Sequence, residues 1–539
     1  MSDMSTPFNQ QNWLDKAIAY VAPKIAVQRM AQRATLALGG GYTGAKLDSS
    51  IMNRWMPRAG SPTADISRDL PMLRARSRDQ MRNAPVALGA LNTTVSHVVG
   101  TGLSYTPAVD GKFLGLTPEQ LEEWSADTKR RFDAWAISLD VDLARRLNFY
   151  GIQELGLRTM LESGDTICIT PRVARNGGPT RLALQLVEAD RVCNPDNKPN
   201  SANLVDGIEL EPTTGESLAM YVARTHPGDV LGTVTEWLRV PMRGDSTGRR
   251  NVLHMFKVLR PGQVRGVPMI APILEPLKQL SRWTDAELNA AVVSSLFSVF
   301  VKMDPDAFDD MFEGDGTKAT YLEKACNWSG DLESGQAVNL LPGEDIVTTQ
   351  PGRPNPAFDP FWAAIVRQIG MALEMPYEVL TMHFQSSYSA ARAALLMAWK
   401  AFRSRRDMLS TYLCQPVFEL WLDDEVAEGR ISAPGYFASE LVRAAWRGAI
   451  WTGDGPGSID PSKEVDAAQK RVDMGISTKE AESILHDGVS WRPKHEQRIK
   501  EVEAERAAGI YFPPAGRTAT TVPAQDGEDA PPAPPAPKK

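Results

Sequence analysis

A proline break followed by a long amphipathic pattern, at residues 376–422, constrains the fold more than any other stretch of the chain. After Pro376 and a short polar loop, residues 389–415 carry apolar side chains at helical spacing, with cationic side chains on much of the remaining circumference. The apolar positions are Leu395, Trp399, Phe402, Leu409 and Leu413. Such a helix would be about 40 Å long, which is long for a globular protein and indicates a strut. Taken alone, the pattern favours an ordinary core helix with a solvated basic face.

Local chemistry predicts both ends of this helix. Ser386, Ser387 and Ser389 offer hydroxyl groups that can cap the free N–H groups of the first turn. Pro416 lacks an N–H group and its ring clashes with the preceding turn. We therefore expect Pro416 to kink or end the helix.

The composition is that of a folded protein with several domains. The length of 539 residues predicts about three or four domains of ordinary size. The hydrophobic fraction of 42% and the charged fraction of 23% are typical of a soluble, folded chain. A formal net charge of −7 argues against a protein whose whole surface grips nucleic acid. This net charge is still compatible with a protein that contacts DNA without binding it tightly.

The sequence lacks two common enzymatic motifs. It contains no Walker A pattern and no H-E-x-x-H pair. Gly39–Gly44 spells G-x-G-x-x-G, but an expected helix precedes it where a dinucleotide site needs a strand, so we interpret it as a hinge. We predict no catalytic residue and no cofactor.

Candidate metal ligands also lack the spacing that a site needs. The acidic residues within 304–315 miss the pattern of a calcium loop, and we interpret Glu188, Asp190 and Asp206 as solvated charges. The four cysteines form no C-x-x-C pair, so they are interpreted as small buried hydrophobic residues in a reducing compartment. They are Cys168, Cys193, Cys326 and Cys414. We therefore predict no metal site.

The pattern of apolar residues and of Gly and Pro predicts the other elements. The longest charge-free apolar run, Leu288–Val301, is shorter than the roughly 20 residues that a bilayer needs, so we expect a buried or interface helix there. We expect Ser477 to cap a later helix with Glu480. Helices are expected at Trp13–Leu36, Leu73–Arg82, from Pro85 to Gly100, Pro118–Leu139, Phe149–Ser163, Ala271–Met303 and Phe358–Leu373. Strands are expected near 166–172, 182–187, 219–224 and 252–258.

Four motifs in a fixed order give the chain a family resemblance. They are Arg-Ser-Arg-Asp with Val-Val-Gly-Thr-Gly-Leu in 76–103, Arg-Pro-Gly-Gln-x-Arg-Gly-x-Pro in 260–268, Ser-Tyr-Ser-x-Ala-Arg with Trp-x-x-Phe and Arg-Arg in 387–406, and Asp-Pro-x-Lys-Glu in 460–464. Over roughly residues 60–500 the sequence resembles the portal proteins of lambda-type tailed phages. The second motif is the most specific, because many Gly and Pro positions agree at once.

The resemblance implies an α+β portal fold with a mixed α/β wing, long stem helices, a small α+β clip insert and a helical crown. By position, the expected parts are an N-terminal arm (1–60), the wing (61–269), the first stem helix (270–303), the clip (304–356), the second stem helix with tunnel loop and long helix (357–424), the crown (425–512) and a disordered Pro-rich tail (513–539).

The resemblance also implies the functional residues. The tunnel loop facing DNA would be Thr381, Met382, His383, Phe384, Gln385, Ser386 and Ser387. The helix supporting it would contribute Arg392, Trp399, Phe402, Arg405 and Arg406.

The implied function is a non-enzymatic ring, expected to have twelve subunits, at one capsid vertex of the virion. Double-stranded DNA would pass through it without sequence recognition, during packaging and ejection. The implied partners are the terminase, the major capsid protein and the head-tail connector, with no membrane and with assembly in the host cytoplasm. The alternatives are a nuclease subunit of the packaging apparatus, and a non-catalytic capsid scaffold or adaptor.

Overall fold

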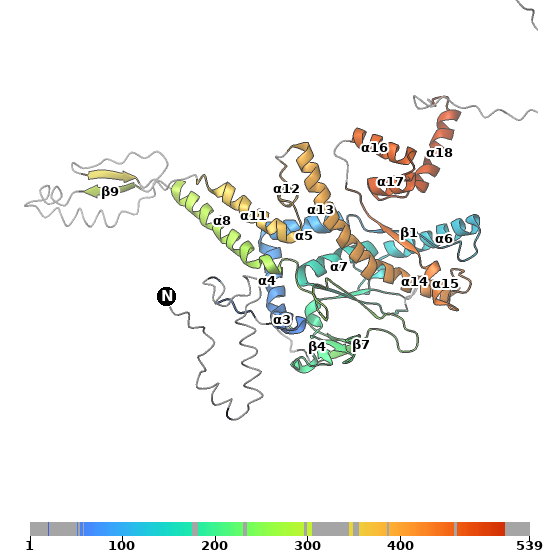
Figure 1. The fold of residues 1–539 in the computed structure, drawn as a ribbon, viewed down its shortest axis with the longest axis horizontal. Coiled ribbons are helices and arrows are strands. Elements are labelled where there is room, and N and C mark those ends of the chain that lie inside the picture. Colours follow the sequence, from blue (N-terminus) through green and yellow to red (C-terminus); the bar gives the residue numbers. More distant parts are fainter. Residues whose placement is uncertain are drawn as a thin grey trace, which may run out of the picture. The chain divides into compact units, whose positions relative to one another are not determined.

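The structure, a computed structural model, describes residues 20, 51, 54–57, 59–174, 182–229, 234, 236–295, 299–303, 344–348, 355–384, 387–456 and 461–511. The chain divides into two compact units, Met1–Asp65 and Ile66–Lys539, and the second contains the elements discussed below (Figure 1). Four expectations lie outside the described residues: the helix at Trp13–Leu36, the hinge at Gly39–Gly44, most of the insert at 304–356 and the tail at 513–539.

The first helices of the second unit begin and end where local chemistry places them. Pro85 occupies the first turn of α5, as predicted, because a helix does not use the N–H groups of its first turn. Thr117 and Gln120 form a capping box at the start of α6, with bonds of 3.3 and 3.0 Å. Helix α3 (Pro62–Ile66) spans the division between the two units in the sequence, and the helices after it are α4 (Leu70–Asn83), α5 (Pro85–Val98), α6 (Pro118–Ile137) and α7 (Phe149–Ser163).

Two antiparallel sheets follow α7, so the fold is α+β, as predicted. The three-stranded sheet has the order β3-β2-β8, and the four-stranded sheet has the order β4-β5-β6-β7, with β4 and β7 at its edges (Figure 1). Their strands are β2 (Asp165–Ile169), β3 (Gln185–Val187), β4 (Leu204–Val205), β5 (Ile208–Leu210), β6 (Ser217–Ala223), β7 (Trp237–Pro241) and β8 (Val252–Phe256). A separate pair joins β1 (Ser104–Pro107) to β11 (Ala449–Thr452).

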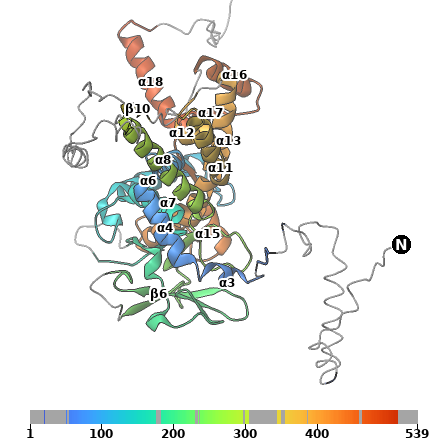
Figure 2. The same cartoon turned by 90° about the vertical axis from the view of Figure 1, so that its left-hand side faces the viewer.

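The helix expected at Ala271–Met303 is shorter than predicted. A 3₁₀ turn at Ala271–Ile273 leads into α8 (Leu274–Ser295), and Val299–Met303 forms strand β9, which pairs with β10 (Glu344–Thr348). The prediction of helix up to Met303 is therefore wrong. The sequence Val-Phe-Val at 299–301 is β-branched and aromatic, and it favours a strand once a partner strand is available. Helix α11 (Phe358–Leu373) lies beside α8 in both views (Figure 1 and Figure 2).

The long amphipathic pattern folds as three consecutive helical segments. They are α13 (Tyr388–Leu409), a π-helical turn (Ser410–Cys414) and α14 (Gln415–Ala427). Pro416 does not end the helix, contrary to one predicted outcome. The π-helical turn precedes it, so Pro416 lies in the first turn of α14, where no N–H donor is needed.

The C-terminal part of the described chain is mostly helical. Its helices are α15 (Glu440–Trp446), α16 (Pro461–Asp473), α17 (Lys479–Asp487) and α18 (Trp491–Ala507). The cap of α17 is Thr478, whose hydroxyl accepts the N–H of Ala481 at 3.1 Å, and not Ser477 as predicted. The Glu480 carboxylate instead accepts the N–H of Trp491 at 2.8 Å, so it links α17 to α18.

An aromatic core joins the two ends of the second unit. Tyr105 of β1 stacks on Phe418 of α14 with ring centroids 4.3 Å apart, and Phe132 of α6 meets Trp421 of α14 edge-on at 5.1 Å. These rings are buried, and burying each one from water contributes roughly 2–3 kcal/mol. Cys168 and Cys414 are buried in the same cluster, which confirms the predicted burial of those two residues, whereas Cys193 is only partly buried.

Candidate functional site

The structure places the predicted tunnel loop between two helices. Thr381 is the last residue of α12 (Tyr377–Thr381), and its hydroxyl donates to the carbonyl of Tyr377 at 2.8 Å, so it belongs to a helix and not to a loop. Met382 follows in the left-handed conformation with φ of 55°. Met382, His383 and Phe384 are exposed, with Met382 71% accessible. Gln385 and Ser386 lie outside the described residues.

The serine caps that the sequence predicts are not formed in the described residues. Ser387 occupies the N-cap position of α13, but its hydroxyl makes no capping hydrogen bond. Ser389 already lies inside the helix. The free N–H groups in the first turn of α13 therefore need water or other groups as hydrogen-bond acceptors, as is common at helix ends.

Three of the five predicted supporting residues gather where α13 meets α5. The His97 ring of α5 stacks on Phe402 at 5.0 Å and meets Trp399 edge-on at 6.1 Å. Arg406 donates to the carbonyl groups of His97 and Val98, both at 2.9 Å, and thereby satisfies the last turn of α5. Burial, with the Arg406 charge as a second cause, lowers the pKa of His97 below its ordinary value.

The other two supporting residues lie elsewhere along α13. Arg405 donates to the carbonyl of Leu373, the last residue of α11, at 3.0 Å and lies 3.7 Å from the Glu374 carboxylate. Arg392 forms a partly exposed ion pair of 3.8 Å with Glu464 of α16, an interaction worth at most about 1 kcal/mol. Arg392 therefore contributes little to this region.

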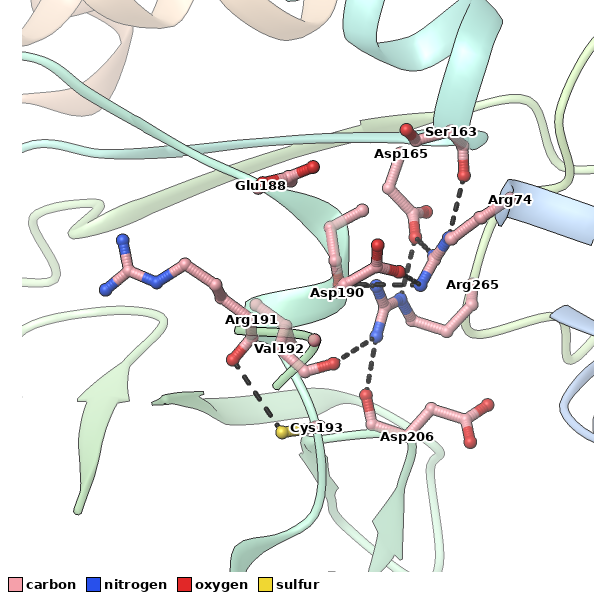
Figure 3. A network of polar contacts seen from close by, with 12 residues as sticks. Arg74, Ser163, Asp165, Glu188, Asp190, Arg191, Val192, Cys193, Asp206 and Arg265 are labelled. Carbon is pink, nitrogen blue, oxygen red and sulfur yellow. Dashed lines mark hydrogen bonds and ion pairs between the residues drawn. The ribbon is translucent and has the colours of Figure 1, made fainter. Parts of the chain in front are cut away.

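A buried arginine network, which sequence reasoning missed, lies where α4 meets both sheets (Figure 3). We use this name for Arg74, Asp165, Asp190, His254 and Arg265. The Asp165 carboxylate accepts bonds from Arg74 Nη2 at 2.6 Å, Arg265 Nε at 2.7 Å and the N–H of Gly266 at 2.6 Å. The Nε2 atom of His254 lies 3.1 Å from the other side of this carboxylate.

The Arg265 guanidinium satisfies three backbone carbonyl groups with its remaining nitrogens. It donates to Ala189 at 2.8 Å, Val192 at 2.9 Å and Asp206 at 2.6 Å. One side chain thus joins β2 to the segment that leads into the four-stranded sheet. A buried ion pair stabilises a fold only when such further hydrogen bonds offset the loss of hydration.

The pKa of Asp165 shows that the attraction prevails over the cost of burial. Burial alone would raise this pKa, but Arg265, His254 and Arg74 together hold the pKa of the Asp165 carboxyl well below its usual range. Asp165 is therefore ionised at neutral pH. Both arginines come from stretches that carry the family motifs or adjoin them, but Asp165 follows Gly164 in a stretch without any recognised pattern.

Asp190 and Asp206 are not solvated charges, contrary to the sequence interpretation. Asp190 pairs with Arg74 at 3.3 Å and with Arg78, and Asp206 accepts bonds from the Ser67 hydroxyl and from the Asn200 amide at 2.9 Å. Arg74 of α4 therefore points inward, since it is only 4% accessible.

Glu188, Asp190 and His226 place one ligand atom each within 4.8 Å of one another, so we tested the group as a metal site. His226 Nδ1 accepts the N–H of Gly228 at 2.9 Å, which places the proton of the neutral ring on Nε2. Nε2 is the atom that faces the two carboxylates, at 3.6 and 3.7 Å, so its lone pair is not free for a metal. Arg78 already pairs with both carboxylates, and Arg74 also pairs with Asp190. The group fits an ion-pair cluster and not a metal centre.

The described part of the chain combines side-by-side long helices, an exposed loop at a helix break and an α+β body with a buried arginine network. Residues 48–406 match the sequence model described as "Phage portal protein, lambda family". The chain belongs to this family, as its motifs predict. No helix in the described part of the chain is both long enough and apolar enough to cross a bilayer.

Similar proteins come from two coliphages. The chain is 26% identical over 506 residues to the portal protein of Escherichia phage N15, covering 89% of this chain and 92% of that protein. It is 24% identical over 499 residues to portal protein B of Escherichia phage lambda, covering 89% and 91%. A solved structure titled as the neck of a native GTA particle with C12 symmetry covers 78% of this chain and 93% of its own, at 13% identity and a TM-score of 0.39.

Proposed function

We propose that this chain forms a ring-shaped channel at one capsid vertex of the virion, through which double-stranded DNA is packaged and later ejected. The observation that carries the proposal is membership of the lambda portal family over residues 48–406. On this proposal twelve copies close the ring, and it docks the terminase, the major capsid protein and the head-tail connector. The role is structural and not enzymatic, and the subunits assemble in the host cytoplasm.

Exposed apolar side chains on α8 and α11 support a ring. Leu288 and Val292 of α8 are 64% and 53% accessible, and Phe361 and Met371 of α11 are 53% and 75% accessible. A ring needs a head-to-tail interface that closes by rotation, and side-by-side helices with uncovered apolar side chains can provide one.

The chemistry of the loop tip supports passage of DNA without tight binding. The exposed tip, Met382–Phe384, has no lysine or arginine side chain. Each phosphate that a protein neutralises adds salt-dependent affinity, with a slope of about −0.9 per contact, so many cations at the pore would lock the duplex. A tip of Met, His and Phe can touch the duplex without holding it.

Electron microscopy and a loop variant test the proposal. Negative-stain images of the purified full-length protein are expected to show rings with a central hole. A chain that stays monomeric under all assembly conditions would contradict the ring. Divalent-metal-dependent cleavage of DNA by the purified chain would favour the nuclease alternative.

The loop variant replaces only the exposed tip, because Thr381 belongs to α12. Met382→Gly combined with His383→Ser and Phe384→Ser should leave ring assembly intact and reduce packaging of DNA or its retention in the head. Met382 is the position to convert to glycine, since its φ of 55° suits that residue. Normal packaging and retention by this variant would refute the role of the loop.

A further inference from the structure

Helix α11 ends in a tight capping motif, and the chain continues from this motif through α12 to the loop tip. The N–H of Met375 donates to the carbonyl of Gly370 at 2.9 Å, and the N–H of Glu374 donates to Met371 at 3.3 Å, which is the Schellman pattern. Glu374 takes the left-handed conformation of this motif with φ of 58°, a position where glycine is usual. A Cβ on Gly370 would lie 2.5 Å from the Met375 carbonyl oxygen, so the chain folds back closely over α11.

Arg405, which lies in α13 after the loop in the sequence, binds this end of α11. Its Nη2 donates to the Leu373 carbonyl, a last-turn group that α11 cannot satisfy internally, and its charge favours the negative end of the helix dipole. Its side chain is only 13% accessible. Within the described part of the chain, both of its polar partners, Leu373 and Glu374, belong to the end of α11.

The neighbouring residue fixes α13 to a different helix. Arg406 donates to the last carbonyl groups of α5 and also to the Asp454 carbonyl at 2.9 Å. Helix α12, between α11 and the loop, contacts α5 and buries Val379 and Leu380. Two consecutive arginines therefore bind α13 to the ends of α11 and α5. The exposed tip lies in the chain between α12 and α13, and these contacts hold both of its flanking segments.

We propose that Arg405 is a positioning residue, which clamps the end of α11 to α13 and so fixes where the tip at Met382–Phe384 stands. The clamp is independent of what the tip does, whereas its effect on DNA rests on the proposed function. Without the clamp, the Leu373 carbonyl loses its charged donor, and the left-handed Glu374 loses a partner that stabilises it. The turn from Glu374 to Met375 should then open more often.

Hydrogen–deuterium exchange on assembled full-length protein tests the clamp. Arg405→Met keeps the length of the side chain but removes its donors and charge. We expect the amides of Glu374, Met375 and His383 to exchange about tenfold faster or more, in line with losing a hydrogen bond to a charged group. Arg405→Lys retains one donor and the charge, so it should recover part of the protection.

Two further variants are controls. Arg403→Met changes an exposed arginine of the same helix and should leave exchange at 374–384 unchanged. Glu374→Gln keeps the Leu373 carbonyl bond and removes only the carboxylate charge, so its effect should be smaller than that of Arg405→Met. Chymotrypsin cleavage after Phe384 gives a second readout, which should accelerate most in Arg405→Met and not at all in Arg403→Met.

The possible outcomes distinguish the proposal about Arg405 from the proposed role of the tip in the channel. Unchanged exchange at 374–384 in Arg405→Met would overturn the clamp, as would an equal acceleration over the whole chain, since that would report global destabilisation. Faster local exchange together with reduced packaging would support both proposals. Faster local exchange with normal packaging and retention would uphold the clamp and refute the role of the tip in the channel.

Discussion

The Asp165 carboxylate accepts a 2.7 Å hydrogen bond from Nε of Arg265, and the two side chains are 0% and 2% accessible to solvent. The two residues are 100 positions apart in the sequence. Because Arg265 also binds three carbonyl groups from a second segment, this pair joins α4 and both sheets into one body.

Asp165→Asn should destabilise the protein strongly. The substitution keeps the shape of the side chain but removes the carboxylate that the buried guanidinium groups of Arg265 and Arg74 share, which leaves Arg74 with Asp190 alone. Breaking a buried pair in this way typically costs about 3–5 kcal/mol. Urea unfolding of the full-length chain would measure the loss. Glu209→Gln is the control, because its 2.8 Å pair with Arg239 lies at the surface and should be worth about 1 kcal/mol or less. An equal cost for the two substitutions would contradict the network.

The contribution of Asp165 should disappear in acid. Its folded pKa is depressed, so its stabilisation is complete above the unfolded value of about 3.9 and falls as the pH drops from there towards the folded pKa. The difference in unfolding free energy between wild type and Asp165→Asn should be constant from about pH 7 to about pH 5. It should shrink by about 1 kcal/mol near pH 3. A difference that grows on acidification would show the opposite shift.

Gly266→Ala should disrupt the same region by steric contact. A Cβ at this position would lie 2.0 Å from the carbonyl oxygen of Gly164 and 2.8 Å from Cβ of Phe256, so backbone must move, at a cost of about 3 kcal/mol or more. Gly89→Ala provides the contrast. Gly89 lies inside α5 with no atom within 4 Å of the added Cβ, and the substitution should stabilise the protein by about 0.5–1 kcal/mol. Thermal melts of both variants would compare the two effects.

Leu288→Lys should prevent ring formation without unfolding the subunit. The side chain is 64% accessible on α8, so the monomer loses little, whereas a lysine in an apolar interface would bury a charge. Analytical ultracentrifugation and negative-stain imaging would measure the loss of rings. Leu238→Lys on β7 is matched, because Leu238 is also 64% accessible, and it should still form rings. Rings of normal yield from Leu288→Lys would exclude this part of α8 from the interface.

Local signals in the sequence were enough to predict the bounds of two helices to the residue. Helices α7 and α11 have the predicted bounds, Phe149–Ser163 and Phe358–Leu373. The Asn148 side chain accepts the N–H of Gly151 at 2.9 Å and Gly164 ends α7 with φ of 92°, so both ends depend on residues that adjoin the helix. Strand β11 was missed because its partner, β1, lies far away in the sequence.

The candidate loop was predicted from the polar sequence after Pro376 and from the family resemblance, and the structure shows which of its described residues belong to a helix. The sequence could not show that Thr381 completes α12 or that Ser387 forms no capping bond, because both depend on how the chain turns after α11. Arg405 and Arg406 stood out as a basic pair, yet they have different partners, α11 and α5, because consecutive side chains on a helix point about 100° apart.

Composition, helical periodicity and motif order by themselves determined the α+β class, most helices and the family of this protein, because each depends on neighbouring residues or on their order. The tertiary structure alone decided which charges are buried. Arg74, Asp165 and Arg265 look like ordinary surface charges in the sequence, and they become one network because folding brings positions 91 and 100 residues apart within hydrogen-bond distance. Ionic and hydrogen-bond energies depend on distance and on exclusion of water, and neither quantity is encoded locally in a sequence.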